Sequence, residues 1–400
     1  MPAYLDHAAT TPLRPEAAAA VVAELSQAGN ASSLHGAGRR ARRAVEEARE
    51  SLAEAVGAGA SEVVWTSGGT ESDNLAVKGL FWARRGADPR RRRVLASAVE
   101  HHAVLDAVAW LVDHEGAEVT WLPVDAAGRV EVAAVAAALA ERPEEIALLT
   151  CMWANNEVGT LQPVRQVAEL AHAAGVPVHT DAVQAVGHVP VDFTASGVDA
   201  LSLSAHKFGG PVGAGALVLR RGLDLVALQH GGGHELGVRS GTLDVASARG
   251  AAVALAASVA ELRPEAERLR DLREQLVAGL RAQVPGIAVR GDADPAGRLP
   301  GHAHVTVPDC EGDSLLYLLD ARGVEVSTGS ACQAGVPRPS HVLLAMGVEP
   351  EEARGALRFS LGRTSTAADV AAAVAAFGPA VERAQRARRS ARARSARRAS

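Results

Sequence analysis

Lysine is almost absent from this chain of 400 residues: of its 41 basic residues, only Lys78 and Lys207 carry an amine. Arginine cannot lose its proton in a protein, so it cannot serve as a neutral nucleophile, whereas a lysine in a dry site can. Lys207 follows the alternating apolar run 199–206 and precedes the turn 208–211. We therefore expect it at the carboxyl end of a strand, where open α/β sheets bind their ligands.

Cysteine is scarce as well, and long apolar runs are missing. The three cysteines stand far apart without a Cys-x-x-Cys pair, so no local zinc site or four-cysteine cluster is encoded. No uninterrupted apolar stretch approaches the roughly 20 residues of a membrane span, and residues 1–6 lack the features of a signal peptide. Unpaired cysteines fit a reducing compartment, so we expect a cytoplasmic protein with no membrane partner. The mild net charge of -5 argues against a protein whose main domains bind nucleic acid.

What the chain does contain is a repeating order of strand and helix patterns. Helical patterns, the clearest from Arg39 to Val56, separate most of the runs that predict strands, which lie near residues 63–66, 93–98, 118–122, 146–151, 176–180, 199–204 and 215–219. This alternation predicts an α/β protein with a mostly parallel sheet covered on both faces. A long helical stretch from about Val245 to Val284 leads into what we expect to be a smaller α+β domain, because 400 residues exceed one typical domain.

An acid follows the strand that precedes Lys207. The run 176–180 ends in Asp181, so this carboxylate and the Lys207 amine are expected to project from neighbouring strand ends into one crevice. Pyridoxal phosphate needs such a pair, because a lysine holds it as a Schiff base and a carboxylate keeps its pyridine nitrogen protonated. The spacing alone leaves ordinary loop charges as an equal alternative.

Residues 63–74 read as a strand, a glycine turn and the start of a helix. Backbone N–H groups of such a turn, together with a hydroxyl such as that of Thr70, bind a phosphate dianion without any lysine. The signal is weak by itself. The turn lacks both the Gly-Lys-Ser/Thr ending of a Walker loop and the glycine spacing of a dinucleotide site.

The three cysteines lie in different settings. Cys332 lies in the segment 324–340, a short strand that runs into a loop of small residues closed by prolines, as expected of an exposed and reactive thiol. Cys151 ends the apolar run 146–150 and is most simply a small buried hydrophobic residue. Cys310 has acidic neighbours, which should raise its pKa and make it a poor nucleophile.

Taken together, these motifs and their order resemble the cysteine desulfurases of the NifS/IscS type, within the class V aminotransferase family. The resemblance runs from Tyr4 to Arg363, and its specific motifs are residues 66–74, 100–101, 155–159, 204–207, 230–235, 239–242 and 329–332. It implies the pyridoxal-phosphate fold type I, with a large cofactor-binding domain at 14–250. It also implies a small domain, made of 1–13 plus 251–380, that carries the Cys332 loop.

The same resemblance implies a role for each matching residue. Lys207, Cys332 and His101 would be catalytic, with His101 stacked on the pyridine ring as a proton shuttle. Arg358 would clamp the substrate carboxylate, and Asn156 would contact that carboxylate or the phenolic oxygen of the ring. Thr242 would reach the phosphate from the other subunit of a homodimer. The residues implied to bind pyridoxal 5'-phosphate are Gly69, Thr70, His101, Asn156, Asp181, Gln184, Ser204, His206, Lys207 and Thr242.

Two of these residues have simpler interpretations. His101 opens the helical run 102–106, so it could merely cap or pack against a helix. Arg358 alternates with apolar residues in 357–361, which places it on the polar face of a strand, where an arginine is usually just solvated. Both alternatives remain open for the sequence by itself.

The implied activity is conversion of L-cysteine to L-alanine with a persulfide on Cys332, whose sulfur would serve iron–sulfur cluster assembly and other thiolation pathways. Within the same fold, an aminotransferase or a selenocysteine lyase is the alternative. From another class, a metal or nucleic-acid carrier would use the 14 histidines and the arginine-rich end. No resident metal is expected, although Cys332 could transiently ligate an iron–sulfur cluster.

Residues 381–400 are strongly basic and of low complexity. We interpret them as a helix end that frays into a solvated tail, in preference to a docking site for an acidic partner or RNA. The resemblance fades here. Because the corresponding segment of related enzymes helps to seat the sulfur acceptor, the sequence leaves open whether an iron–sulfur scaffold, a tRNA-thiolating enzyme or a cofactor pathway receives the sulfur.

Overall fold

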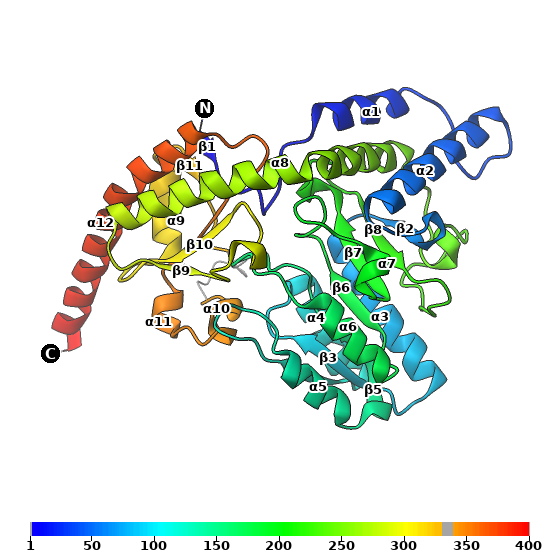
Figure 1. Ribbon diagram of the computed structural model, residues 1–400, viewed down its shortest axis with the longest axis horizontal. Helices are drawn as coiled ribbons and strands as arrows, with labels where there is room; N and C mark the ends of the chain where they lie inside the picture. Colours follow the sequence, from blue (N-terminus) through cyan, green and yellow to red (C-terminus); the bar gives the residue numbers. More distant parts are fainter. Residues whose placement is uncertain (1, 330–338, 400) are drawn as a thin grey trace.

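The computed structural model describes residues 2–329 and 339–399. Its largest element is a seven-stranded sheet (Figure 1). The strand order is β2 (Val63–Thr66), β8 (Gly215–Leu219), β7 (Ala200–Ser204), β6 (Val178–Asp181), β5 (Ile146–Thr150), β3 (Arg93–Ser97) and β4 (Glu118–Leu122). Only β8 runs antiparallel to its neighbours, β2 and β7. Each predicted strand is therefore present, with ends that differ by at most two residues.

Helices cover both faces of this sheet, as the alternating pattern predicts. The helices of this part are α1 (Pro15–Leu25), α2 (Gly36–Ala55), α3 (Gly69–Ala87), α4 (His102–Glu115), α5 (Val132–Ala140), α6 (Val164–Ala173) and the short α7 (Phe193–Ser196). Alternate strand residues point to opposite faces. On β3, Val94 packs with α3 and α4, whereas Leu95 belongs to the core that α2 and α6 complete.

The helix α8 (Val245–Gln283) joins the two halves of the molecule (Figure 1). Its first part, with Leu255, packs into the core of the large sheet, and its second part, with Leu276, packs into a separate core. Among the described residues it is the one helix long and apolar enough to cross a membrane. Since its apolar side chains fill two cores, we assign it as a core helix.

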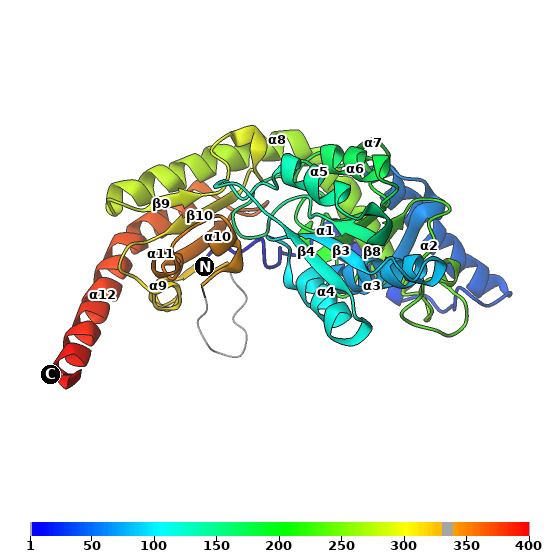
Figure 2. The same ribbon diagram turned by 90° about the horizontal axis from the view of Figure 1, so that it is seen from below.

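The second half is built on an antiparallel sheet, in the order β12 (Ala356–Ser360), β10 (His302–Thr306), β9 (Ala288–Arg290), and on the parallel pair β1 (Ala3–Tyr4) and β11 (Val324–Glu325). Its helices are α9 (Gly312–Asp320), α10 (His341–Ala345), α11 (Pro350–Ala353) and α12 (Ala367–Ala399). Figure 2 shows this half beside the large sheet. Strand β1 brings the first residues of the chain to this half, so Leu5 shares a core with Phe359.

The expected basic tail is helical throughout the part of 381–400 that the structure describes. Val381 and Ala384 are buried in the second core, and the Arg388 guanidinium donates to the Cys310 carbonyl oxygen at 3.0 Å. The packed part of α12 therefore extends past residue 381, and the last turns extend beyond the other elements (Figure 2). The domain boundaries stay a prediction, and α8 runs unbroken through the boundary placed at residue 250.

Candidate active site

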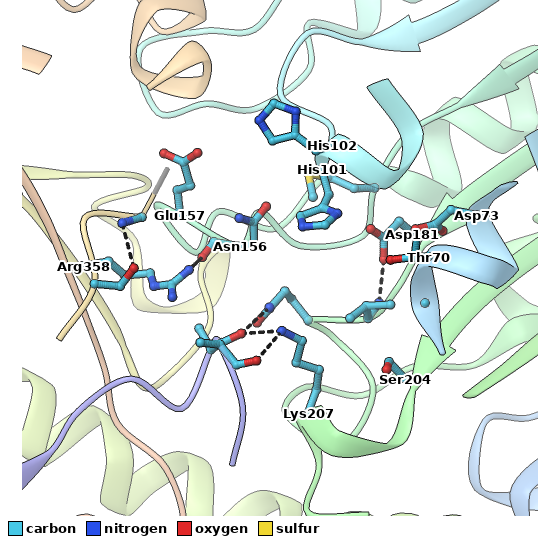
Figure 3. Close-up of a pocket in the computed structure, with 18 of the residues that line it drawn as sticks. Thr70, Asp73, His101, His102, Asn156, Glu157, Asp181, Ser204, Lys207 and Arg358 are labelled. Atoms are coloured by element: carbon cyan, nitrogen blue, oxygen red, sulfur yellow. Dashed lines mark hydrogen bonds between the residues drawn. The ribbon is translucent and has the colours of Figure 1, made fainter. Parts of the chain in front are cut away.

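A cavity of about 330 Å³ lies at the carboxyl ends of the central strands, between the two halves (Figure 3). Among the residues that line it are the predicted Gly69, Thr70, His101, Asn156, Asp181, Gln184, Ser204, His206, Lys207 and Arg358. Thr242 does not line this cavity and is exposed, and Cys332 lies outside the described residues. The structure thus brings all the predicted site residues that it describes into one cavity, with the exception of Thr242.

Asp181 and Lys207 face the cavity from adjacent parallel strands. Asp181 is the last residue of β6, and Lys207 ends the turn that follows β7. The Lys207 Nζ atom donates to the carbonyl oxygens of Ala8, at 2.7 Å, and Ala9, at 2.9 Å. Burial, and then the Arg358 charge, lowers the pKa of Lys207 to about 8. A substantial share of this amine is therefore neutral at a mildly alkaline pH.

The first turn of α3 forms the candidate phosphate cradle. Gly68 has a φ of +149°, which is natural only for glycine, and a Cβ atom on Gly69 would lie 2.6 Å from the Val183 side chain. Because Gly68 and Gly69 have no side chains, nothing of theirs covers the first N–H groups of α3. These N–H groups have no hydrogen-bond partners within the helix. The site therefore fits a phosphate group, with the Thr70 and Ser204 side chains beside it.

His101 both caps a helix and lines the cavity. Its Nδ1 accepts from the Ala103 N–H at 3.1 Å, so the structure shows the capping role that the sequence left open. Burial is the main cause that lowers its pKa. Because Nδ1 is an acceptor, the neutral ring carries its proton on Nε2. The same ring therefore holds one proton at a defined atom.

Arg358 lies on the cavity side of β12, and its neighbours Leu357 and Phe359 are fully buried on the other side. Its Nη1 donates to the Asn156 carbonyl oxygen at 2.9 Å, and its Nη2 pairs with Asp6 at 2.7 Å. The Nε atom is buried without a partner among the described residues. Arg358 is thus not a solvated arginine, and its Nε–H is a donor that no described residue satisfies.

Several acids near the cavity have no counterpart among the predicted residues. Glu100 is fully buried, and burial, followed by the charge of Asp181, raises its pKa to about 8. Burial likewise raises the pKa of Asp73 and of Glu157. The sequence-based prediction also omits Asp6, the partner of Arg358. The sequence does show these acids inside otherwise apolar or glycine-rich motifs, which could have marked them as unusual. Their spacing along the chain does not indicate that they lie close together in the fold.

The structure confirms that Cys151 is buried and that the pKa of Cys310 is raised, as the sequence predicts. Burial raises the pKa of Cys151 well above its ordinary value. Burial is also the main reason that the pKa of Cys310 rises to about 11, while Arg388 opposes the rise. The acidic neighbours Asp309 and Glu311 act in the expected direction but are the smaller causes. Neither thiol is suited to nucleophilic attack.

Comparison with known proteins places this site in a family. The model of the aminotransferase class-V family matches residues 3–372. The chain is 57% identical over 385 residues to an IscS-like cysteine desulfurase of Mycobacterium tuberculosis, covering 96% of this chain and 98% of the relative. It is 44% identical to cysteine desulfurase IscS of Dictyoglomus turgidum, covering 92% of this chain and 91% of the relative.

Solved structures agree with the sequence comparison. A NifS-like protein superposes with a TM-score of 0.87 at 34% identity, covering 96% of this chain and the whole of that chain. The phosphate cradle, the strand-end acid and the lysine fit pyridoxal phosphate, the cofactor of this family. With fold, cavity and sequence in agreement, the chain belongs to the class-V aminotransferase family.

Proposed function

We propose that this protein is a cysteine desulfurase, which converts L-cysteine to L-alanine and leaves the substrate sulfur on Cys332 as a persulfide. The observation that carries the proposal is the meeting of a lysine of lowered pKa, a buried acid and an arginine with a free Nε in one cavity. The names of the relatives support the same activity.

The cofactor would be held by residues of the large-sheet half. Thr70, Ser204, His206 and the backbone of Gly69 would take the phosphate, Asp181 the ring nitrogen, and Gln184 the phenolic oxygen, while His101 would cover the ring. When bound through Lys207, pyridoxal phosphate supplies the electron sink that acidifies the Cα proton of the substrate.

The chain's own residues then have defined tasks. Arg358 binds the substrate carboxylate with its free Nε–H, and Asn156 lies beside it. The neutral Lys207 amine removes the Cα proton, and His101 exchanges a proton at Nε2. The Cys332 thiolate attacks the substrate sulfur: the Cβ–Sγ bond breaks, an S–S bond forms, and the carbon takes up a proton to give alanine.

We also propose a homodimer in which Thr242 serves the partner's site. Thr242 is exposed and does not line the cavity of its own chain. Large apolar side chains are exposed around it and near the α1–α2 connection: Val22 at 66%, Leu25 at 71%, Leu34 at 85% and Leu236 at 69%. The 2.7 Å contact between Ser32 and His234 joins these two regions. A second copy that covers this surface would remove it from water.

The sulfur acceptor belongs to the same proposal. An iron–sulfur scaffold or a tRNA-thiolating enzyme of the cytoplasm would receive the persulfide sulfur. Trapping acceptors as mixed disulfides on Cys332 identifies the partner directly.

Product analysis tests the activity. With L-cysteine, a small thiol and no keto acid, the holoenzyme is expected to release alanine and sulfide. After a single turnover without the thiol, mass spectrometry should find one added sulfur on the Cys332 peptide. Cys332→Ala should bind cofactor and cysteine but form neither product, whereas Cys151→Ala and Cys310→Ala should remain active. Alanine formed only with a keto acid, or sulfur on Cys151 or Cys310, would refute the proposal.

A further inference from the structure

The segment that carries Cys332 leaves and rejoins the described chain at one place. Gly329 precedes the segment 330–338, and Ser340 and His341 follow it closely. Both Gly329 and His341 line the cavity. One side chain of the opposite half, Glu157, lies against both ends.

The first end is fixed on β12 and beside Glu157. Ser327 exchanges two backbone hydrogen bonds with Arg358, at 2.7 Å and 3.2 Å, and its Oγ accepts from the Gly329 N–H at 3.1 Å. Gly329 has a φ of +84°. A Cβ atom there would lie 3.3 Å from His304 Nε2 and 3.6 Å from Glu157 Oε2, so the backbone of Gly329 lies close to the carboxyl group.

The second end is bonded to the same carboxyl oxygen. The Ser340 hydroxyl donates to Glu157 Oε2 and accepts from the Leu343 N–H at 3.2 Å, which caps α10. His341 donates from Nε2 to the Glu100 carbonyl oxygen at 3.0 Å. The end that follows the segment is therefore fixed to residues of the large-sheet half.

Glu157 itself is held firmly. It is 2% exposed, and its N–H donates to Asn155 Oδ1 at 2.9 Å. The Asn155 amide donates in turn to the Val99 carbonyl oxygen at 3.0 Å, which ties this turn to the loop after β3. A rigid turn thus presents one carboxyl oxygen to both ends of the segment.

We propose that Glu157 is a positioning residue: it bonds the end that follows segment 330–338, lies against the end that precedes it, and so keeps the Cys332 thiol within reach of the substrate sulfur. Fixing the ends of a loop reduces the conformations open to the residues between them and raises the effective concentration of a group they carry. This inference rests on the proposed function, because it concerns the sulfur-transfer step.

Three variants of the holoenzyme test the proposal. Glu157→Ala should slow single-turnover transfer of sulfur to Cys332 by about tenfold or more, since the thiol spends less time near the substrate. Glu157→Gln should stay within about threefold of wild type, because its amide oxygen still accepts from Ser340. Ser340→Ala, which frees only the second end, should fall between them. Cofactor content and the Kd for L-cysteine should be unchanged in all three.

Hydrogen exchange supplies a readout that does not depend on turnover. In Glu157→Ala, amides of Ser327–Gly329 and of the first turn of α10 should exchange faster than in wild type, whereas in Ser340→Ala only those of the first turn of α10 should do so. Thr160→Val is the matched control. Thr160 is a fully buried residue of the same turn whose hydroxyl donates to the Ala127 carbonyl oxygen, away from both ends. It should alter neither the transfer rate nor exchange at the two ends.

Two results would overturn the proposal. One is unchanged exchange and unchanged transfer in Glu157→Ala. The other is a loss of cofactor or cysteine binding as large as the loss of transfer, which would place Glu157 in the binding site instead. A wild-type enzyme that forms no alanine from cysteine would instead refute the proposed function, and the exchange experiment would still report on the two ends.

Discussion

The two sides of the cavity are built in different ways. On the side of the large sheet, Asp181 and Lys207 project from strands that are adjacent in the sheet and close in sequence, so the backbone of a parallel sheet fixes their separation. On the opposite side, the key contact joins Arg358 to Asp6, residues that are 352 positions apart. We call these the sheet side and the cap side.

The difference suggests a division of labour. Open α/β sheets bind ligands at the carboxyl ends of their strands, and the sheet side accordingly holds the groups suited to the cofactor. The cap side supplies Arg358 and both ends of the segment with Cys332, to which the proposed function assigns the substrate carboxylate and the substrate sulfur. Changes on the sheet side should therefore abolish chemistry, and changes on the cap side should alter substrate binding or sulfur transfer.

The largest effect is expected on the sheet side, from Lys207→Arg. Arginine keeps the positive charge but cannot act as a neutral amine, so turnover should fall by about a thousandfold or more. The measurement is alanine release, with far-ultraviolet circular dichroism as the control for folding. Appreciable activity, or an unchanged visible band of lysine-bound cofactor, would contradict the assignment of Lys207.

The pH dependence of cofactor capture sharpens the same point. Burial lowers the pKa of Lys207 to about 8, so its neutral, reactive fraction rises with pH and levels off above that value. The rate at which the cofactor-free protein captures pyridoxal phosphate should therefore increase about tenfold per pH unit below 8 and then flatten. Stopped-flow absorbance measures this rate. A rise that continues to pH 10 would show that the amine is not desolvated.

On the cap side, Asp6→Ala should act mainly on KM. Asp6 holds the Nη2 atom of Arg358, and its loss lets the guanidinium turn away from the substrate carboxylate. We expect KM for L-cysteine to rise about tenfold, roughly 1.4 kcal/mol, with little change in kcat. Asp6→Asn, which keeps an acceptor for Nη2, should show a smaller rise. A lower KM in Asp6→Ala would mean that Asp6 competes with the substrate for Arg358.

The two sides also differ in how far the sequence predicts them. Strand ends and glycine turns are local patterns, so Asp181, Lys207 and the phosphate turn could be found from periodicity before any resemblance was used. Asp6 could not, because its contact with Arg358 depends on the bridge that Asp6 forms with Ser360 of β12, at the other end of the chain. Nor could Glu157, whose partner Ser340 is 183 residues away. Tertiary contacts of this range leave no local pattern.

The smallest effect is expected outside both sides, at the end of α12. Truncation after Arg389 keeps Ala384 in the second core and the bond from Arg388 to the Cys310 carbonyl, so stability and alanine release should both stay at wild-type values. Truncation after Val381 removes these contacts and should lower the free energy of unfolding by about 2 kcal/mol or more.

Even the shorter chain should keep its kcat, because no described residue beyond 381 lines the cavity. Thermal unfolding and alanine release, measured on both truncations, separate stability from chemistry. Equal melting temperatures for the two would mean that the packed part of α12 ends before Ala384. A loss of alanine release in the longer protein, with a small thiol present, would show instead that the end of α12 takes part in the reaction, and the division between the two sides of the cavity would then be incomplete.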